Sequence, residues 1–236
     1  MRNRVFPHAR SSLAGAPRAA KKRIEIGRLF QNEDLSAAEL VGAALYQAQL
    51  HSCKLDRADL GLAHLDGAVL VSCSLVDVDL EMAVLTGARI ESCAFMGGHA
   101  VAAAFDEVQL CDTSFRGGSV ARTSWNGAVA RAVDFSGTCA VEVVWNGGWF
   151  QECDFRGADL SRGFAWNVRF EQCDFRGADL SGMSLADCLF DRCGLYGLLG
   201  FPVLKAPCDF CCCDLSRERD GSLLVDGQEI LAHWER

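Results

Sequence analysis

The chain has little proline and few aromatic residues, with 4 prolines and 9% Phe, Trp and Tyr among 236 residues. It has no apolar run near the roughly 18 residues of a membrane span, and no apolar signal-peptide core near its start. Its thirteen cysteines are an odd number and too sparse for a small disulfide scaffold, which favours a reducing compartment. We therefore expect a soluble cytoplasmic protein without a membrane segment.

The net charge of −8 hides a strong asymmetry along the chain. Residues 1–30 contain eight Lys and Arg against one Glu, whereas the rest contains fifteen basic and thirty acidic residues. We expect residues 1–26 to form a basic, flexible tail, although enrichment in Arg and Ser leaves an organelle transit peptide open. The acidic body argues against direct binding of nucleic acid.

Every fifth residue from 35 to 195 is large and apolar, apart from Ala100, Ala130, Ala140 and Ala165. A small residue such as Ala or Cys usually stands two positions earlier. Five residues advance a helix by roughly 500°, and an odd step along a strand changes face, so neither element places these side chains on one side. The chain must turn at each repeat, as it does in a β-solenoid.

A slower repeat of twenty residues gives the number of sides. The segment 153–161 recurs without change at 173–181, and cysteines stand at 53, 73 and 93 and again from 153 to 213. Four five-residue units therefore make one coil, and residues twenty apart should stack. The stack of small side chains at 100, 120 and 140 lies beside a stack of large side chains at 105, 125 and 145. Together they keep the volume of the core constant.

Three segments match in full a five-residue motif of Ala, then Asp or Asn, then Leu, followed by any two residues. They begin at Ala58-Asp59-Leu60, Ala158-Asp159-Leu160 and Ala178-Asp179-Leu180. Through this motif, residues 30 to 215 resemble the pentapeptide repeat family, although the motif degrades between about 96 and 148. The resemblance implies an all-β fold: a right-handed quadrilateral parallel β-helix of about nine coils, which we place at 27–215. Residues 216–236 are expected to form a C-terminal turn and helix cap with Ile230, Leu231 and Trp234 on one face. In related proteins such a segment also mediates dimerisation.

The chemistry-bearing residues do not form a recognisable catalytic motif. Nine cysteines fall on the small inward position and are expected to pack as free thiols, with stacked disulfides as the alternative. A zinc site at Cys208, Cys211, Cys212 and Cys213 is disfavoured because the register places 211 and 212 outside. The histidines are scattered, and a convex rod offers no dry cleft. We expect no enzymatic activity, metal or cofactor.

Acidic residues stand directly before the large inward residue on two adjacent sides of the rod. The candidate partner-binding acids are Glu39, Asp59, Asp79, Asp159 and Asp179 on one side and Asp134, Asp154 and Asp174 on the next. Each Asp could simply accept hydrogen bonds at its turn. Together, a net charge of −15 over roughly 43 Å approaches the charge density of duplex DNA.

Two functional hypotheses follow. The chain resembles the quinolone- and albicidin-resistance members of the family, and this resemblance implies a duplex mimic that occupies the DNA-binding saddle of DNA gyrase, a type II topoisomerase. The alternative is a structural or protein–protein interaction scaffold with another partner, in which the Asp residues only maintain the motif.

Overall fold

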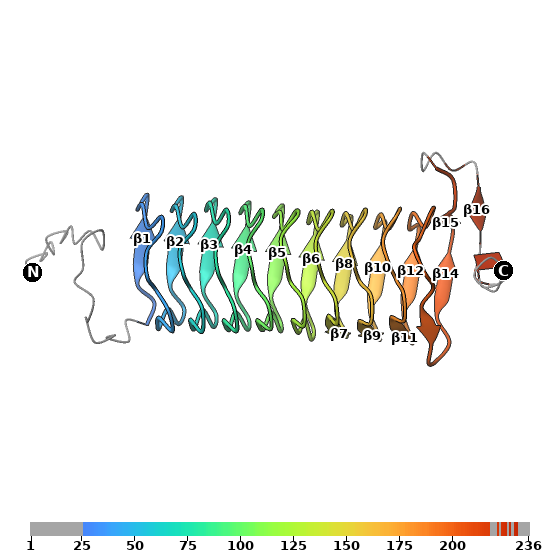
Figure 1. Cartoon of the computed structure of the whole chain (residues 1–236), viewed down its shortest axis with the longest axis horizontal. Helices are drawn as coiled ribbons and strands as arrows, with labels where there is room; N and C mark the ends of the chain where they lie inside the picture. Colours follow the sequence, from blue (N-terminus) through green and yellow to red (C-terminus); the bar gives the residue numbers. More distant parts are fainter. Residues whose placement is uncertain (1–25, 218–220, 222, 226, 228, 231–236) are drawn as a thin grey trace, which may run out of the picture.

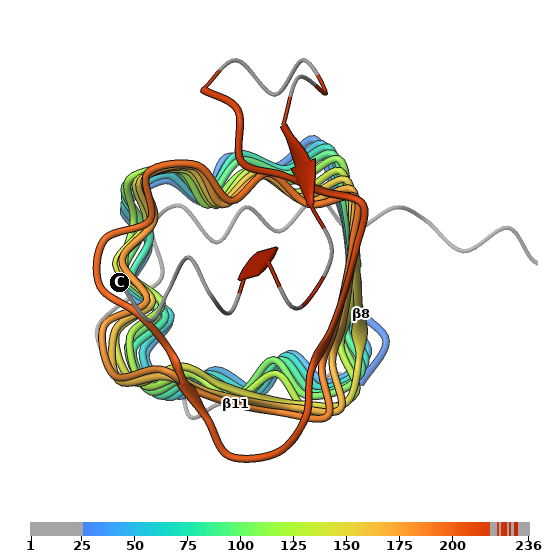
Figure 2. The same cartoon turned by 90° about the vertical axis from the view of Figure 1, so that its right-hand side faces the viewer.

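The computed structural model describes residues 26–217, 221, 223–225, 227 and 229–230. These residues form a four-sided parallel β-solenoid, seen as stacked coils in Figure 1 and end-on in Figure 2. The predicted fold class is therefore confirmed. Most of the predicted basic tail, residues 1–25, lies outside the described residues.

The described residues contain short strands of two or three residues each. They are β1 Leu29–Gln31, β2 Gln49–His51, β3 Val69–Val71, β4 Arg89–Glu91, β5 Gln109–Cys111, β6 Val129–Arg131, β7 Val144–Asn146, β8 Trp149–Gln151, β9 Phe164–Trp166, β10 Arg169–Glu171, β11 Ser184–Ala186, β12 Leu189–Asp191, β13 Val203–Leu204, β14 Asp209–Cys211, β15 Cys213–Asp214 and β16 Leu224–Val225.

Each coil passes through four sides, which we name from their inward residues. Side A holds inward residues 30, 50 and onward to 210, and its ten strands form one parallel sheet from β1 to β14. Side B follows with 35 to 215, side C with 40 to 180, and side D with 45 to 185. Strands β7, β9, β11 and β13 form a four-stranded sheet on side D. Figure 2 shows that sides A and D, marked by β8 and β11, meet at one corner.

The corners explain how a five-residue repeat can keep one face inward. From Phe30 to Leu195, the residue two positions after each inward residue has a left-handed backbone, for example Arg57 with φ of 58° and Arg162 with φ of 57°. The backbone turns there, so the next small residue again faces the core. Successive coils are joined by parallel backbone hydrogen bonds, such as Leu60 N to Asp79 O at 2.7 Å. The twenty-residue register therefore persists through the degraded motif between 96 and 148.

The core changes from aliphatic to aromatic along the rod. The first coils contribute mainly leucine, whereas phenylalanines from Phe95 to Phe175 stack on side B with ring centroids 4.8 to 5.3 Å apart. Trp125 stacks on Phe105 at 4.2 Å, beside the smaller column that contains Val120. These offset contacts fill the interior without enlarging the coil.

The last coil departs from the predicted register. Leu204 rather than residue 205 pairs with Leu185, so the spacing on side D falls from twenty residues to nineteen. The spacing returns to twenty where Phe190 pairs with Phe210. Lys205, which the five-residue count would place inward, is exposed. Prolines at 202 and 207 frame this segment, and each lacks the N–H that a regular coil would donate.

The C-terminal segment leaves the parallel five-residue register. β16 pairs antiparallel with β15, and Val225 and Ile230 are buried in the core cluster. The Ile230 side chain is fully buried. Leu231 and Trp234, the other residues proposed for the cap or dimer contact, lie outside the described residues.

Candidate functional site

Side C carries the first group of predicted acidic residues. Glu39, Asp59 and Asp79 stand at equivalent positions of consecutive coils and are joined by parallel bridges. One carboxylate oxygen of Asp59 accepts a hydrogen bond from Gly61 N at 3.1 Å, and one of Asp79 accepts from Glu81 N at 2.9 Å. Within the described part of the chain, no Lys or Arg forms an ion pair with these three side chains. Within the described residues, their negative charge is therefore not compensated by an ion pair.

The same side carries two further acids near its C-terminal end. Asp159 accepts from Ser161 N at 3.0 Å and Asp179 from Ser181 N at 2.8 Å. The column between Asp79 and Asp159 is interrupted by His99, Ser119 and Cys139. The five predicted acids of side C therefore form two separate clusters. The local hydrogen bond that the sequence suggests for the motif Asp is present in both.

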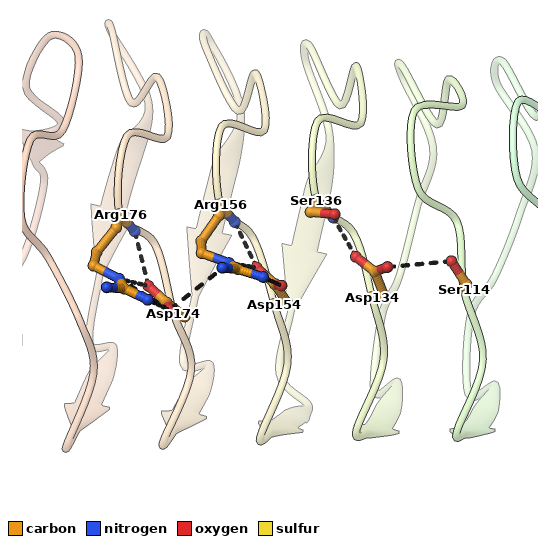
Figure 3. Close-up of polar contacts among 7 residues, drawn as sticks. All are labelled: Ser114, Asp134, Ser136, Asp154, Arg156, Asp174 and Arg176. Atoms are coloured by element: carbon orange, nitrogen blue, oxygen red, sulfur yellow. Dashed lines mark hydrogen bonds and ion pairs between the residues drawn. The ribbon is translucent and has the colours of Figure 1, made fainter. Parts of the chain in front are cut away.

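On side B, arginines pair with the predicted acids (Figure 3). Arg156 donates to both oxygens of Asp154 at 2.6 to 3.0 Å, and Arg176 donates to both oxygens of Asp174 at 2.7 to 3.1 Å. Arg156 also lies 3.9 Å from Asp174 in the next coil. Burial alone would raise the pKa of Asp154, but hydrogen bonds from Arg156 hold this pKa below its ordinary value. The negative charges of Asp154 and Asp174 are therefore compensated by arginines on the same side of the rod.

Asp134, the third predicted acid of side B, has a different environment. One of its oxygens accepts from Ser136 N at 2.9 Å, and the other accepts from the Ser114 hydroxyl at 3.4 Å (Figure 3). Serine takes the place that arginine occupies in the next two coils. The structure therefore brings the three side B acids into one column but compensates the charge of two of them.

Net charge is distributed unevenly along the rod. Residues 31–115, which we call the acidic half, contain thirteen Asp and Glu but three Lys and Arg. Residues 116–217, the near-neutral half, contain twelve Asp and Glu and ten Lys and Arg. The sequence-based density of one net charge per roughly 3 Å averaged these two regions. Most of the uncompensated charge lies in the first half of the solenoid.

The cysteines contribute packing rather than a recognisable site. All thirteen are free, and eight of the nine predicted inward cysteines are buried, while Cys208 is half-buried. Burial raises the pKa of Cys213 to about 12, which keeps this thiol protonated. Cys211 and Cys212 are exposed, as the register predicts. No three His, Cys, Asp or Glu side chains within the described ranges are grouped so that they could hold a metal ion.

The part of the chain that the structure describes contains no helix that is both long and apolar enough to cross a membrane.

Sequence reasoning missed an exposed apolar region where sides A and D meet, which includes Trp149, Phe164 and Trp166. Aromatic residues at outward positions, directly before or after an inward residue, were the available signal.

Comparisons with known proteins agree with this architecture. The chain matches the family described as pentapeptide repeats, with eight copies over residues 30–67, 63–98 and 153–192. A search of curated proteins found no match.

Two solved structures are similar at low identity. A trypsin-treated variant of QnrB1, a plasmid-mediated fluoroquinolone resistance protein, is 15% identical, with a TM-score of 0.46, and the match covers 67% of this chain and 89% of QnrB1. HetL, involved in heterocyst differentiation regulation in the cyanobacterium Nostoc sp. strain PCC 7120, is 19% identical, with a TM-score of 0.32 and coverage of 86% and 94%. Neither similarity identifies a partner for this chain. The repeat matches and the stacked twenty-residue coils place the chain in the pentapeptide repeat family.

Proposed function

We propose that this protein is a non-enzymatic acidic rod that binds a DNA-handling enzyme in place of duplex DNA. The candidate partner is DNA gyrase or another type II topoisomerase, and the proposed effect is to protect the enzyme from poisoning or to regulate that poisoning. The observation that carries the proposal is the excess of ten acidic over basic residues in the acidic half. A basic DNA-binding surface would recognise that charge.

The charge density supports this proposal quantitatively. The acidic half spans a little over four coils, or about 20 Å at about 4.8 Å per coil. Its excess of ten acidic residues corresponds to about one net charge per 2 Å, against one per about 1.7 Å in duplex DNA. The near-neutral half has one net charge per roughly 12 Å on the same basis. The acidic half therefore matches the duplex more closely than the rod as a whole.

Two of the side C acids in the acidic half are also held in fixed positions. Because Asp59 and Asp79 each use one oxygen to accept a backbone N–H of the following turn, their carboxylates are oriented before any partner arrives. Both lie in a column whose backbones are joined from coil to coil. Less side-chain freedom is then lost on binding, which favours affinity for a matching array of basic groups.

Two variants with equal charge change test where binding occurs. The first is E39Q/D59N/D79N in the acidic half, and the matched control is D134N/D159N/D179N in the near-neutral half. Every substituted residue stands directly before an inward residue, and none forms an ion pair with another described residue. The amide oxygen that replaces each carboxylate can still accept the turn hydrogen bond. Stability should therefore change little in either variant.

The measurement is the association rate on immobilised DNA gyrase at two salt concentrations, with competition by duplex DNA. We expect the acidic-half variant to associate about tenfold more slowly than the parent and the control to change less. Parent binding should weaken with salt and with added duplex. Equal rates for the two variants, or parent binding that is insensitive to salt, would reject the duplex-mimic proposal. No binding by the parent would favour the scaffold with another partner.

A further inference from the structure

Stacked cysteines at the small inward positions differ in their access to solvent. Seven of them form two stacks that are buried throughout, at 53, 73 and 93 and at 153, 173, 193 and 213. A third stack consists of Cys188 and Cys208, which directly precede the paired strands β12 and β14. Cys188 is buried, whereas Cys208 is half-buried. Among the stacked cysteines of the described residues, Cys208 is therefore the one that solvent can reach.

Backbone hydrogen bonds hold Cys188 and Cys208 side by side. Asp187 N donates to Pro207 O at 3.1 Å. Asp209 N donates to Cys188 O at 2.8 Å. Because these bonds continue the parallel pairing of β12 with β14, the two Cα atoms lie about 4.8 Å apart, within the range of about 4.4–6.8 Å that a disulfide spans. The side chains are also in contact, since the Cys188 thiol hydrogen-bonds to the Cys208 sulfur.

The irregular last coil explains the exposure of Cys208. Its side D spacing is nineteen residues rather than twenty, and Figure 2 shows this orange-red segment looping outward beside β11. In a regular coil the thiol donates to a carbonyl of the preceding coil, as Cys213 does to Phe190 O at 3.4 Å. The Cys208 thiol contacts Ala206 O of its own coil at 3.7 Å. An oxidant can therefore reach this sulfur from the side of the irregular segment.

The hydrogen bond between the two thiols makes Cys208 the better nucleophile. It holds the pKa of Cys208 below its ordinary value and that of Cys188 above it, so the more exposed sulfur more readily forms the reactive thiolate. A hydrogen bond from Cys93 also lowers the pKa of Cys73, but both of these side chains are buried. Access to solvent, rather than acidity, therefore distinguishes the two pairs.

We propose that Cys188 and Cys208 form a thiol pair that a peroxide oxidises to a disulfide, independently of the proposed binding function. The Cys208 thiolate attacks one oxygen of hydrogen peroxide, the O–O bond breaks, and hydroxide leaves and takes a proton from solvent. The Cys188 sulfur then attacks the Cys208 sulfenic acid, the S–O bond breaks, and hydroxide leaves with the Cys188 proton as water. Two thiols lose two electrons, and one peroxide is reduced to two waters.

The disulfide fastens the irregular coil to the regular coil before it. It joins residues twenty positions apart, and a cross-link of that length raises the melting temperature of a chain of this size by about 6–12 °C. Before oxidation the pair is free, like all thirteen cysteines of the structure. Oxidation therefore stabilises the C-terminal end of the solenoid, and reduction reverses the effect.

The test uses the full chain with C139S/C211S/C212S in every protein, because these exposed thiols also react with peroxide. C188A/C208A removes the pair and introduces the Ala found at 128 in the same stack. C73V/C93T is the matched control, because it removes a buried pair and introduces the Val and Thr found at 133 and 113 in that stack. The single variants C188A and C208A separate the two steps of the reaction.

After peroxide, the background protein and C73V/C93T should yield a peptide that links 188 to 208, lighter by two hydrogen atoms, and should melt about 6–12 °C higher until reductant is added. C188A/C208A should show neither change. In C188A the sulfenic acid accumulates, so a 1,3-dione should label Cys208 at least about tenfold more than it labels Cys188 in C208A. Absence of the linked peptide from the background protein overturns the inference. Equal linkage of Cys73 to Cys93, or preferential labelling of Cys188, also overturns it.

Discussion

Replacement of Thr123 by Val tests the polar contact of Trp125, one of two tryptophans buried in the described core. Trp125 is 1% exposed, and its Nε1 donates to the Thr123 hydroxyl at 2.8 Å. That hydroxyl in turn donates to the carbonyl of Val120. Valine has nearly the same shape as threonine but cannot accept the indole hydrogen bond. The substitution leaves a buried N–H without a partner and creates no large cavity.

The expected cost is about 1–3 kcal/mol, the penalty for an unsatisfied buried donor. For a chain of this length, each kcal/mol lowers the melting temperature by about 2–4 °C. The fold should survive, because Trp145 Nε1 already has no hydrogen-bond partner among the described residues, and Val143 stands where the preceding coil has Thr123. The measurement is thermal unfolding followed by circular dichroism.

Thr138→Val is the matched control. Thr138 is equally buried, and its hydroxyl donates to Phe115 O at 3.1 Å, but this carbonyl also accepts Gly118 N at 3.0 Å. Its loss should cost less than about 1 kcal/mol. If T123V is no more destabilising than T138V, the indole hydrogen bond does not contribute as argued. The same conclusion follows if T123V costs as much stability in a W125F background, which lacks the indole N–H, as it does in the parent.

Three further outcomes are expected. Phe155→Asp or Phe175→Asp should prevent folding by burying an unpaired charge, and a cooperative β-rich melt in either variant would contradict the core register. Reductant and chelator should each leave the melting temperature nearly unchanged, whereas a large drop would reveal a disulfide or a metal. Because the folded pKa of Asp154 is depressed, its contribution is present above about pH 4 and is lost as pH falls through that folded pKa. Arg156→Gln should therefore weaken the acid dependence of stability, and an unchanged pH profile would refute this.

Burial and register follow directly from the sequence because the fold repeats the same five-residue unit, with one large inward residue and one turn, many times. A large residue every fifth position can face one core only if the chain turns regularly, and the twenty-residue repeat then fixes the stacking. The shift near Leu204 breaks this rule locally. The prolines on both sides of Leu204 indicated an irregular coil, but they do not specify at which position the coil is one residue shorter.

Pairing among outward residues was less accessible to sequence reasoning, although part of the signal was present. Residues immediately before and after an inward residue point to the same outer face. An Asp-Phe-Arg sequence therefore places Arg156 beside Asp154 and Arg176 beside Asp174. Treating each acid as an independent charge concealed this compensation. The exposed apolar region where sides A and D meet was missed for a related reason, since its aromatic residues come from different strands.

Separation of core and surface positions allows the two halves of the rod to differ without a change of fold. Inward residues set coil geometry, so outward residues are free to carry charge in one half and exposed apolar side chains in the other.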